Sequence, residues 1–358
     1  MLKVENLSTS YKTIDGNIKV INNLSFDIYE NEIFGIAGES GCGKTTLLKA
    51  LYDIIEFPLE VDSGRVILSG SKNGKPFSYE TGQIRKTWWN NISYIPQAAQ
   101  SVLNPIMRLK YQFLDSIPKE DRGNETEEET LERVAEYLKE LSLDPDLLNA
   151  FPFQLSGGMR QRVIIALATF MSPNVVLADE PTTALDVVVQ CGILMMLMRL
   201  QKQAKNTLVL VSHDMGVHYQ ITNRMGIMYS GSFVELGKTE DIFNNPIHPY
   251  TKMLIGALPR VGDKSPKVGI PGRPPALTNS PPGCRFAPRC PHAKDECHQA
   301  VPLFREVLPG RYAACHMLDS GSTEERQDHS KAKNTSDSQL ADAHEQERSF
   351  TQEERNGD

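Results

Sequence analysis

The feature that most constrains the fold is a glycine-rich string, GESGCGKTT, which directly follows a short apolar run ending at Ala37. Gly38 and Gly43 have four residues between them and are followed by Lys44 and Thr45, the pattern of a phosphate-binding loop. In such a loop the glycines adopt positive φ angles, backbone N–H groups turn inward and the next helix directs its positive end at the anion. The string therefore predicts a buried strand, a phosphate loop and a helix in succession.

The other residues of the string complete the expected nucleotide site. We expect Lys44 to reach the outer phosphates and Thr45 to supply a Mg²⁺ ligand. Ser40, Gly41 and Thr46 are predicted to contact the nucleotide as well. The alternative is a glycine turn that binds nothing, but the apolar run before the string and the helical pattern after it favour the phosphate loop.

Short apolar runs alternate with helical patterns over residues 1–238. Three of the runs are predicted as buried strands, at residues 33–37, 175–178 and 207–211. Each is β-branched or aliphatic and is followed by residues typical of a turn or a helix start. This alternation is typical of an α/β fold built on a largely parallel sheet.

Composition and charge exclude several classes of protein. The chain has 358 residues, with 38 Lys and Arg against 45 Asp and Glu, a formal charge of −7. This acidic balance, without a basic stripe, argues against a general nucleic-acid binder. No apolar run reaches the roughly 18 residues that span a bilayer, and the first residues lack the pattern of a secretory signal. We therefore expect a cytosolic protein whose six cysteines are reduced, ligated or catalytic.

An acidic element follows the second predicted strand, in the string NVVLADEPTTALD. Asp179 and Glu180 end this strand at the edge where a parallel sheet presents its ligands. We expect Asp179 to hold Mg²⁺ through water and Glu180 to polarise a water for in-line attack on the γ-phosphate. An isolated Asp-Glu pair would be interpreted as a solvated loop, and the phosphate loop upstream reverses that interpretation.

The most distinctive string is LSGGMRQRVIIALA, which begins at Leu155. Ser156, Gly157 and Gly158 open a predicted helix, so they offer a hydroxyl and backbone N–H groups at a positive helix end. The predicted apolar face of this helix consists of Val163, Ile164, Leu167 and Ala168. The string therefore predicts a second phosphate-binding site.

Together these strings resemble the motifs of ATP-binding-cassette (ABC) ATPases, in the order expected along the chain. The resemblance implies an α/β P-loop ATPase with a RecA-like mixed sheet core, an antiparallel β subdomain and an inserted helical subdomain. It also implies that two cassettes pair head to tail, each signature string capping the phosphate loop of the other. Binding of ATP and Mg²⁺ and hydrolysis of ATP are the expected activity.

The resemblance implies roles for four further residues. Tyr11 occupies the position of an aromatic ring that stacks on adenine, and Gln97 in ISYIPQ matches the Q-loop and its Mg²⁺ contact. Asp186 matches the D-loop that acts across the dimer, and His213 matches the switch histidine at the γ-phosphate. Alone, Tyr11 would indicate packing and His213 a structural histidine. The expected catalytic set is Lys44, Glu180 and His213.

Three regions differ in composition. Residues 1–238 are interpreted as the nucleotide-binding domain, with a helical subdomain at about 98–165 that includes the acidic amphipathic string after Glu125. Residues 239–318 are rich in proline and cysteine and are predicted to form a small appended domain. Residues 319–358 are acidic and almost without aliphatic or aromatic side chains, so we expect a disordered tail.

Four cysteines lie in the second region, at Cys284, Cys290, Cys297 and Cys315. Four thiols in a short cytosolic module favour a ligated ion or cluster. Zinc normally uses closer pairs, whereas a cluster suits longer loops, and unligated thiols are a further alternative. The region resembles the C-terminal extension of dipeptide and oligopeptide importer ATPases, some of which hold a [4Fe–4S] cluster, so this cluster is the expected cofactor and zinc its alternative.

The same resemblance implies partners and a location. The chain resembles the D-type ATPase of these importers. We therefore expect a homologous F-type cassette ATPase, two transmembrane permeases and, indirectly, a substrate-binding protein as partners. The chain would lie at the cytoplasmic face of the membrane and import di- or oligopeptides. Oligosaccharide or nickel import, a soluble ABC ATPase of DNA repair or translation, and a redox-sensing regulator are the alternatives.

Two other cysteines and two tryptophans have simpler interpretations. Cys42 is interpreted as a small filler in the phosphate loop, the alternative being a thiol activated at a helix N-terminus. Cys191 lies on an apolar face of a predicted helix and is predicted to be a core residue. Trp88 and Trp89 are interpreted as packing or surface aromatics.

Overall fold

The computed structural model describes residues 2–318 except 15, 73, 98–101, 118–121, 123–124 and 260–268. The predicted tail, residues 319–358, lies outside the described residues. The chain divides into two compact units, residues 1–314 and residues 315–358. The following description concerns the first unit, apart from the short helical turn η6 (His316–Leu318) of the second.

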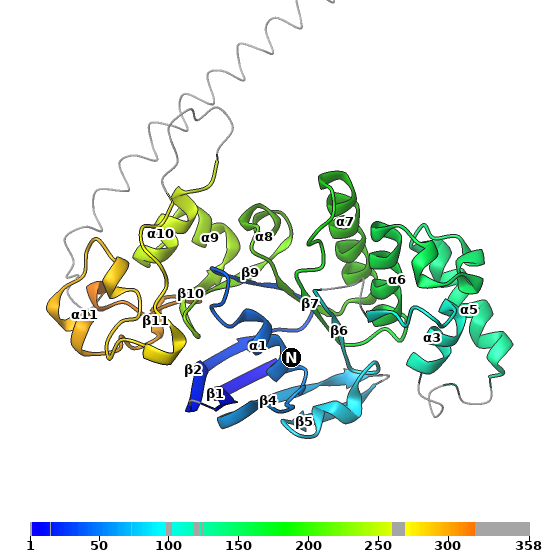
Figure 1. Cartoon of the computed structure of the whole chain (residues 1–358), viewed down its shortest axis with the longest axis horizontal. Coiled ribbons are helices and arrows are strands. Elements are labelled where there is room, and N and C mark those ends of the chain that lie inside the picture. The colour runs from blue at the N-terminus through cyan, green and yellow to red at the C-terminus, as the bar shows by residue number, and fades with distance from the viewer. Residues whose placement is uncertain are drawn as a thin grey trace, which may run out of the picture. The chain divides into compact units, whose positions relative to one another are not determined.

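A four-stranded antiparallel sheet occupies the lower part of Figure 1, with strand order β2-β1-β4-β5. Its strands are β1 (Leu2–Thr13), β2 (Gly16–Ile28), β4 (Leu59–Lys72) and β5 (Lys75–Glu80). One face of the sheet is apolar and buried, because aliphatic residues alternate with polar ones along β1 and β4. This sheet is the expected antiparallel β subdomain.

The second sheet has eight strands in the order β11-β12-β10-β9-β3-β8-β7-β6. Its strands are β3 (Ile33–Ala37), β6 (Ile92–Ile95), β7 (Val175–Asp179), β8 (Thr207–Val211), β9 (Arg224–Tyr229), β10 (Ser232–Lys238), β11 (Arg305–Leu308) and β12 (Arg311–Ala313). The strands from β9 to β6 pair in parallel, and β10, β12 and β11 are antiparallel. The three predicted strands are confirmed, and the sheet is mixed.

Helix α1 (Lys44–Leu51) lies between the two sheets and packs against β2, β4 and β7 (Figure 1). Its aliphatic residues Leu47, Leu48 and Leu51 are fully buried in a core that includes side chains of both sheets. The helix that follows the phosphate loop is therefore fixed on both sides.

A helical layer is inserted between β6 and β7, as predicted. It contains α3 (Leu109–Ser116), α5 (Glu127–Glu140) and α6 (Gly157–Thr169), with the 3₁₀ turns η2 (Pro145–Asn149) and η3 (Pro152–Gln154). Thr126 and Glu129 form a capping box at the start of α5. The predicted apolar face of α6 is buried, and it joins Val134 and Leu138 of α5 in one core.

The remaining helices cover the other face of the eight-stranded sheet or follow it. They are α7 (Val187–Ala204), α8 (Met215–Ile221), α9 (Thr239–Asn244), α10 (Pro249–Gly256) and α11 (Asp295–Gln299), with η1 (Ile84–Thr87), η4 (Leu277–Asn279) and η5 (Ala287–Arg289) as 3₁₀ turns. In the described part of the chain, no helix combines the length and the apolar character needed to cross a membrane.

The structure does not support a separate cysteine-rich domain. Residues 239–314 belong to the same compact unit as the cassette. Strand β12 pairs with β10 through Glu235 and Leu236, so the C-terminal region extends the central sheet. The proline-rich composition after residue 238 therefore does not mark a separate domain. This region is stabilised by the strand pairing that it shares with the cassette.

A buried carboxylate joins this extension to the sheet. Glu235 of β10 is fully buried, and its oxygens accept the backbone N–H groups of Ile247 and His248, each at 2.9 Å. The Arg311 guanidinium of β12 donates to Glu235 at 2.9 Å and to the carbonyl of Asn245 at 2.7 Å. Every oxygen of the buried charge thus has a partner, which offsets the cost of desolvating it.

We predict that Arg311→Met strongly destabilises the protein, because it leaves the Glu235 carboxylate buried without its counter-ion. The expected loss is about 3–5 kcal/mol of unfolding free energy, measured by urea denaturation. Lys139→Met is the matched control, since Lys139 and Glu136 form a surface pair with 56% and 72% exposed side chains, and should cost less than about 1 kcal/mol. A loss in R311M as small as the control's would contradict the assigned role of this ion pair.

Candidate nucleotide site

The phosphate loop takes the conformation that its glycines predict. Gly38, Gly41 and Gly43 have φ angles of 153°, 77° and 105°. A Cβ atom on Gly38 would lie 2.1 Å from the carbonyl oxygen of Met228, so only glycine fits there. Gly43 is the N-cap of α1, which places the positive end of this helix at the loop. The loop therefore forms an anion-binding cradle.

Lys44 is the first residue of α1 and is 6% exposed. Its Nζ donates to the carbonyl oxygens of Gly38 at 2.8 Å and Glu39 at 3.1 Å. The ammonium group is thus held against the loop backbone and beside the cradle. Thr46 follows on α1, and its hydroxyl lies 3.3 Å from the Tyr11 hydroxyl, so the predicted adenine-stacking ring lies near the start of this helix.

Two of the three expected magnesium ligands, Thr45 and Asp179, meet at the carboxyl end of β7, and the third, Gln97, donates to the neighbouring Glu180. The Thr45 hydroxyl donates to Asp179 Oδ1 at 3.2 Å, and the Tyr94 hydroxyl donates to Oδ2 at 2.9 Å. Burial raises the pKa of Asp179, although the hydrogen bonds from Tyr94 and Thr45 oppose this shift. A hydroxyl and a carboxylate oxygen at this distance fit the oxygen ligands that Mg²⁺ prefers.

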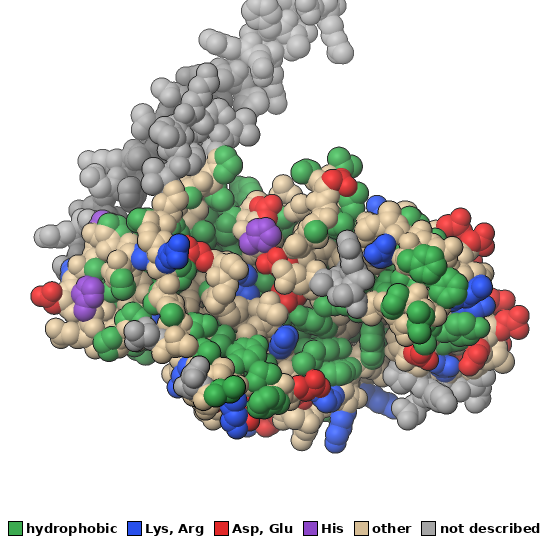
Figure 2. Space-filling model, viewed as in Figure 1, with side chains coloured by type: hydrophobic (Ala, Val, Ile, Leu, Met, Phe, Trp, Pro, Cys, Tyr) green, Lys and Arg blue, Asp and Glu red, His purple; other side chains and the backbone are tan. Residues whose placement is uncertain are grey.

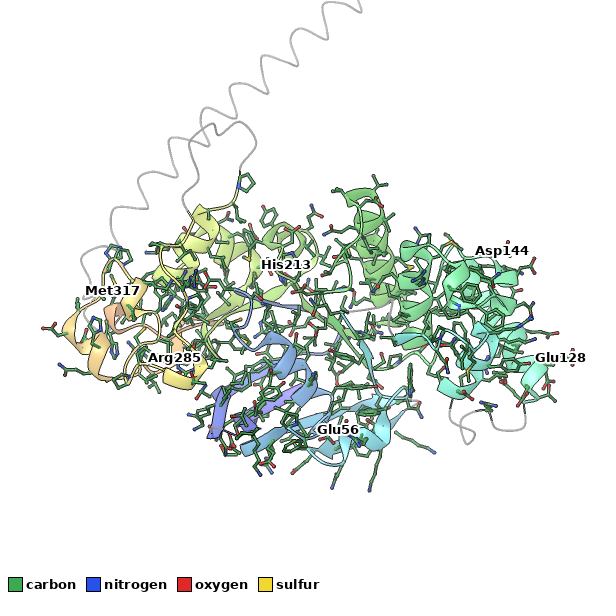
Figure 3. All side chains as sticks on the ribbon, viewed as in Figure 1. Glu56, Glu128, Asp144, His213, Arg285 and Met317 are labelled. Carbon is green, nitrogen blue, oxygen red and sulfur yellow. The ribbon has the colours of Figure 1, made fainter. Side chains whose placement is uncertain are left out.

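Glu180 is the centre of a second group of side chains. Its Oε2 accepts from Gln97 Nε2 at 3.1 Å and from the Thr183 hydroxyl at 2.8 Å. The Nδ1 of His213 lies 3.2 Å from the same oxygen. His213 is on the loop between β8 and α8, where Figure 3 labels it. The structure therefore brings together Glu180, Gln97 and His213, which are distant in the sequence.

Glu180 lies in a strained turn that a backbone hydrogen bond to β8 holds in place. Glu180 has a φ angle of 46°, in the left-handed region, and its N–H donates to the carbonyl of Val211 at 2.9 Å. A non-glycine residue costs about 1–3 kcal/mol in such a conformation. This turn aims the carboxylate toward the loops that carry Gln97 and His213.

The signature string lies apart from the phosphate loop of its own chain. Ser156 is the N-cap of α6, and its hydroxyl accepts the N–H of Met159 at 3.3 Å. Helix α6 packs in the core of the helical layer, whereas α1 packs in the other main core (Figure 1). Gly157 and Gly158 are partly exposed at the start of α6. These groups form no part of the cradle around Lys44.

Asp186 caps the next helix, α7, through a 3.0 Å bond from the N–H of Val189 to its carboxylate. Its side chain is otherwise exposed. The side chain of Val189 also lies where a Cβ on Gly158 would clash, at 2.8 Å. The signature string and the predicted D-loop are therefore neighbours.

Sequence reasoning missed two members of the site. Tyr94 holds Asp179 and Thr183 holds Glu180, as described above. Tyr94 lies on β6, whose pairing with β7 places Tyr94 opposite Leu177. This register between distant strands has no signal in the local sequence. Thr183 did have a signal, because it follows Glu180 by three residues in a tight turn.

The interpretation of Trp88 and Trp89 as packing or surface aromatics agrees with the structure. The prediction that Cys191 is a core residue is wrong. The Trp88 ring stacks on Tyr52 with centroids 4.6 Å apart, and Trp89 packs against the helical core. Cys191 is exposed, because the buried face of α7 begins at Ile193. The apolar run from Val187 contains no periodicity that separates its covered face from its exposed one.

The structure favours the filler interpretation of Cys42. The side chain is 5% exposed, and burial raises the pKa of its thiol even though Lys44 lies nearby. The Sγ atom is 3.9 Å from Lys44 Nζ. A thiol with a raised pKa is a poor nucleophile at neutral pH.

The structure does not support the expected cluster site. The N–H of Cys284 donates to the carbonyl of Cys297 at 2.8 Å, so their segments are adjacent. Cys297 is buried, and Cys290 is half-buried with a thiol pKa raised by burial. Cys315 belongs to the second unit. Among the residues that are described, no three His, Cys, Asp or Glu side chains come together as ligands for a metal. The structure therefore does not support the zinc alternative either.

We predict that N-ethylmaleimide labels Cys191 before Cys42 in the native protein at neutral pH. Cys191 is exposed, whereas the Cys42 thiol is buried and its pKa is raised, so its labelling should become appreciable only at alkaline pH. Peptide mapping by mass spectrometry measures both rates. Once Cys42 is labelled, nucleotide binding should be lost; faster labelling of Cys42 or full binding after labelling would contradict this account.

Two family models match the chain. The model described as ABC transporter matches residues 21–183, which include the phosphate loop, Gln97, the signature string and Glu180. The model described as oligopeptide/dipeptide transporter, C-terminal region, matches residues 234–297.

Solved structures agree with the cassette assignment. The ATP-binding cassette MJ0796, in a dimeric post-hydrolysis state bound to ADP and phosphate, superposes with a TM-score of 0.57 and 29% sequence identity. The match covers 67% of this chain and 99% of MJ0796.

Curated relatives cover almost the whole chain. The dipeptide transport ATP-binding protein DppD of Caldanaerobacter subterraneus is 39% identical over 324 residues, covering 90% of this chain and 98% of the relative. The oligopeptide transport ATP-binding protein OppD of Escherichia coli is 36% identical over 320 residues, covering 88% of this chain and 92% of the relative. The chain belongs to the family of ATP-binding subunits of dipeptide and oligopeptide ABC transporters.

Proposed function

We propose that this protein binds and hydrolyses ATP to drive the import of di- or oligopeptides through a membrane transporter. The observation that carries the proposal is the convergence of Gln97 and His213 on the carboxylate of Glu180, next to a complete phosphate loop. This is the arrangement that in-line attack of a water on a γ-phosphate requires. The relatives named for dipeptide and oligopeptide transport favour peptides over oligosaccharides or nickel as cargo.

The phosphate loop binds the triphosphate in this proposal. The N–H groups of the loop, with Ser40, Gly41 and Thr46, surround the phosphates, and Lys44 turns from the loop carbonyls to the outer phosphates. Thr45 and Asp179 would hold Mg²⁺, with Gln97 as a further ligand, and the cation would supply positive charge that offsets the charge of the phosphates. Tyr11 supplies a ring on which the adenine stacks.

Glu180 orients the attacking water and accepts its proton, and His213 contacts the γ-phosphate. Thr183 and the strained turn at Glu180 keep the carboxylate in place. Positioning of this kind is the protein's main contribution to phosphoryl transfer. Asp179 is nearby but buried and bonded to Thr45 and Tyr94, so it binds the cation rather than the water.

The active form is a dimer of two cassettes in this proposal. The signature string at Ser156, Gly157 and Gly158 begins helix α6 and lies apart from the phosphate loop of its own chain. In the dimer it caps the phosphate loop of the second cassette. Asp186 lies at the same surface. Exposed apolar side chains continue from it along α7 at Val187, Val188 and Met195, with 81%, 81% and 61% exposure, and Figure 2 shows hydrophobic side chains over this helix.

The second cassette is a homologous ATPase of the same transporter. Two transmembrane permeases bind the pair at the cytoplasmic membrane face, and a substrate-binding protein delivers the peptide to them. The Q-loop at Gln97 and the helical layer, about residues 98–165 within a nucleotide-binding domain of residues 1–238, transmit the motion. Residues 239–318 form the extension and 319–358 a tail. The cysteines Cys284, Cys290, Cys297 and Cys315 have no role in this proposal.

We predict that Glu180→Gln retains MgATP binding and loses turnover by a factor of about 10²–10³, because the amide cannot accept a proton from water. The variant should also accumulate as an ATP-bound cassette dimer, measured by size-exclusion chromatography with light scattering. Glu240→Gln, an exposed substitution on α9, is the control and should hydrolyse ATP at the unmodified rate. Near-normal hydrolysis in E180Q would contradict the assignment of the base.

A further inference from the structure

Hydrogen bonds join the phosphate loop to the C-terminal region at Glu39. The Arg289 guanidinium donates to both carboxylate oxygens of Glu39, at 2.7 and 2.9 Å. The backbone N–H of Glu39 donates to the Tyr250 hydroxyl at 3.0 Å. The carbonyl of Glu39 accepts from Lys44 Nζ at 3.1 Å. All three polar groups of this residue are therefore held, and two of the partners come from outside the cassette motifs.

Further hydrogen bonds hold the Arg289 side chain in the orientation that pairs with Glu39. Its side chain is only 4% exposed, and it also donates to the carbonyls of Pro271 and Ile270 and to the Tyr229 hydroxyl. It ends the 3₁₀ turn η5, which lies between Cys284 and Cys290. A planar guanidinium with this many fixed acceptors binds a carboxylate in one orientation.

Tyr250 is fixed by aromatic packing. It is fully buried, and its ring centroid lies 4.7 Å from Tyr229 and 5.3 Å from Phe286. These three rings connect α10, β9 and the cysteine-containing segment under the phosphate loop. The residues Pro274, Pro275 and Leu277 of the same C-terminal region line a small cavity of about 30 Å³ with the loop residues 39–42. The C-terminal region thus packs directly against the loop.

The negative charge of Glu39 affects how strongly the phosphate loop attracts the phosphates of ATP. A carboxylate at the second position of a phosphate loop adds a negative charge next to the site of a polyanion. If it were unpaired, it would repel the phosphates and would compete for Lys44. Arg289 cancels this charge in a partly buried environment, where the side chain of Glu39 is 27% exposed and screening is weaker than in bulk water.

We propose that Arg289 and Tyr250 are positioning residues of the ATP site: they clamp Glu39, neutralise its charge and hold the phosphate loop open for MgATP. This inference rests on the proposed ATP binding and adds a role for the C-terminal region in it. Both residues act through Glu39, the loop residue to which they are hydrogen-bonded. The clamp makes the nucleotide affinity of the cassette depend on the C-terminal region.

The test measures ATP and ADP binding to the full chain by isothermal titration calorimetry, with the melting temperature of each variant. Arg289→Met leaves Glu39 unpaired and should weaken ATP binding about tenfold, with a smaller loss for ADP because it carries less phosphate charge. The double variant Glu39→Gln with Arg289→Met removes both charges and should recover most of the ATP affinity. Arg285→Met is the control, because the guanidinium of Arg285, labelled in Figure 3, donates to the carbonyl of Ser230, which lies outside the phosphate loop.

The outcomes separate the alternatives. A merely structural role for Arg289 predicts equal losses for ATP and ADP and no recovery in the double variant, and either result would overturn the proposal. Tyr250→Phe gives a second route if R289M does not fold, since it keeps the buried ring and removes only the acceptor of the Glu39 N–H. It should weaken ATP binding, and unchanged ATP affinity in Y250F would also overturn the proposal. Absence of ATP binding in the unmodified protein would instead contradict the proposed function.

Discussion

Strands β3, β8 and β7 pair in parallel, so their carboxyl ends lie along one edge of the eight-stranded sheet. The phosphate loop follows β3, Asp179 ends β7 and Glu180 follows it, and the loop with His213 follows β8. Residues that are more than a hundred positions apart in the sequence therefore lie close together at this edge. The short distances around Asp179 and Glu180 depend on this register, because a shift by one residue would turn each side chain to the opposite face.

Packing on both sides of this edge preserves the geometry. Helix α1 is enclosed between the two sheets, so the loop that precedes it cannot move freely. On the other side, the C-terminal region extends the sheet through β12 and reaches the loop at Glu39. The buried Glu235 and Arg311 pair holds that extension in place. The nucleotide site is thus supported by elements from both ends of the described chain.

Local patterns predicted the parts of the site whose chemistry is local. The glycines around Lys44, the acidic strand end at Glu180 and the signature string each carry their own physical signal, and the structure places them at the expected elements. The inserted helices were also predictable, because the spacing of Val134 and Leu138 is helical. The resemblance to cassette ATPases supplied roles that no local pattern gives, such as those of Gln97 and His213.

The remaining features depend on contacts between distant segments. Tyr94 reaches Asp179 through strand pairing, and Arg289 reaches Glu39 across 250 positions of sequence. Composition suggested a separate C-terminal domain, but a proline-rich segment can share a sheet with its neighbour, as β12 does. The four cysteines gave a pattern typical of a ligand set, whereas the described side chains do not converge on a metal. Exposure of Cys191 likewise depends on which face of α7 is covered.

The central claim is that ATP hydrolysis at this edge drives a membrane importer. The most direct test is mass-spectrometric identification of the proteins that co-purify in stoichiometric amounts with this chain from gently solubilised native membranes. The account predicts two multi-span permeases, a second homologous ATPase and a peptide-binding protein. Recovery of the chain only from the soluble fraction, with no membrane protein bound, would contradict it.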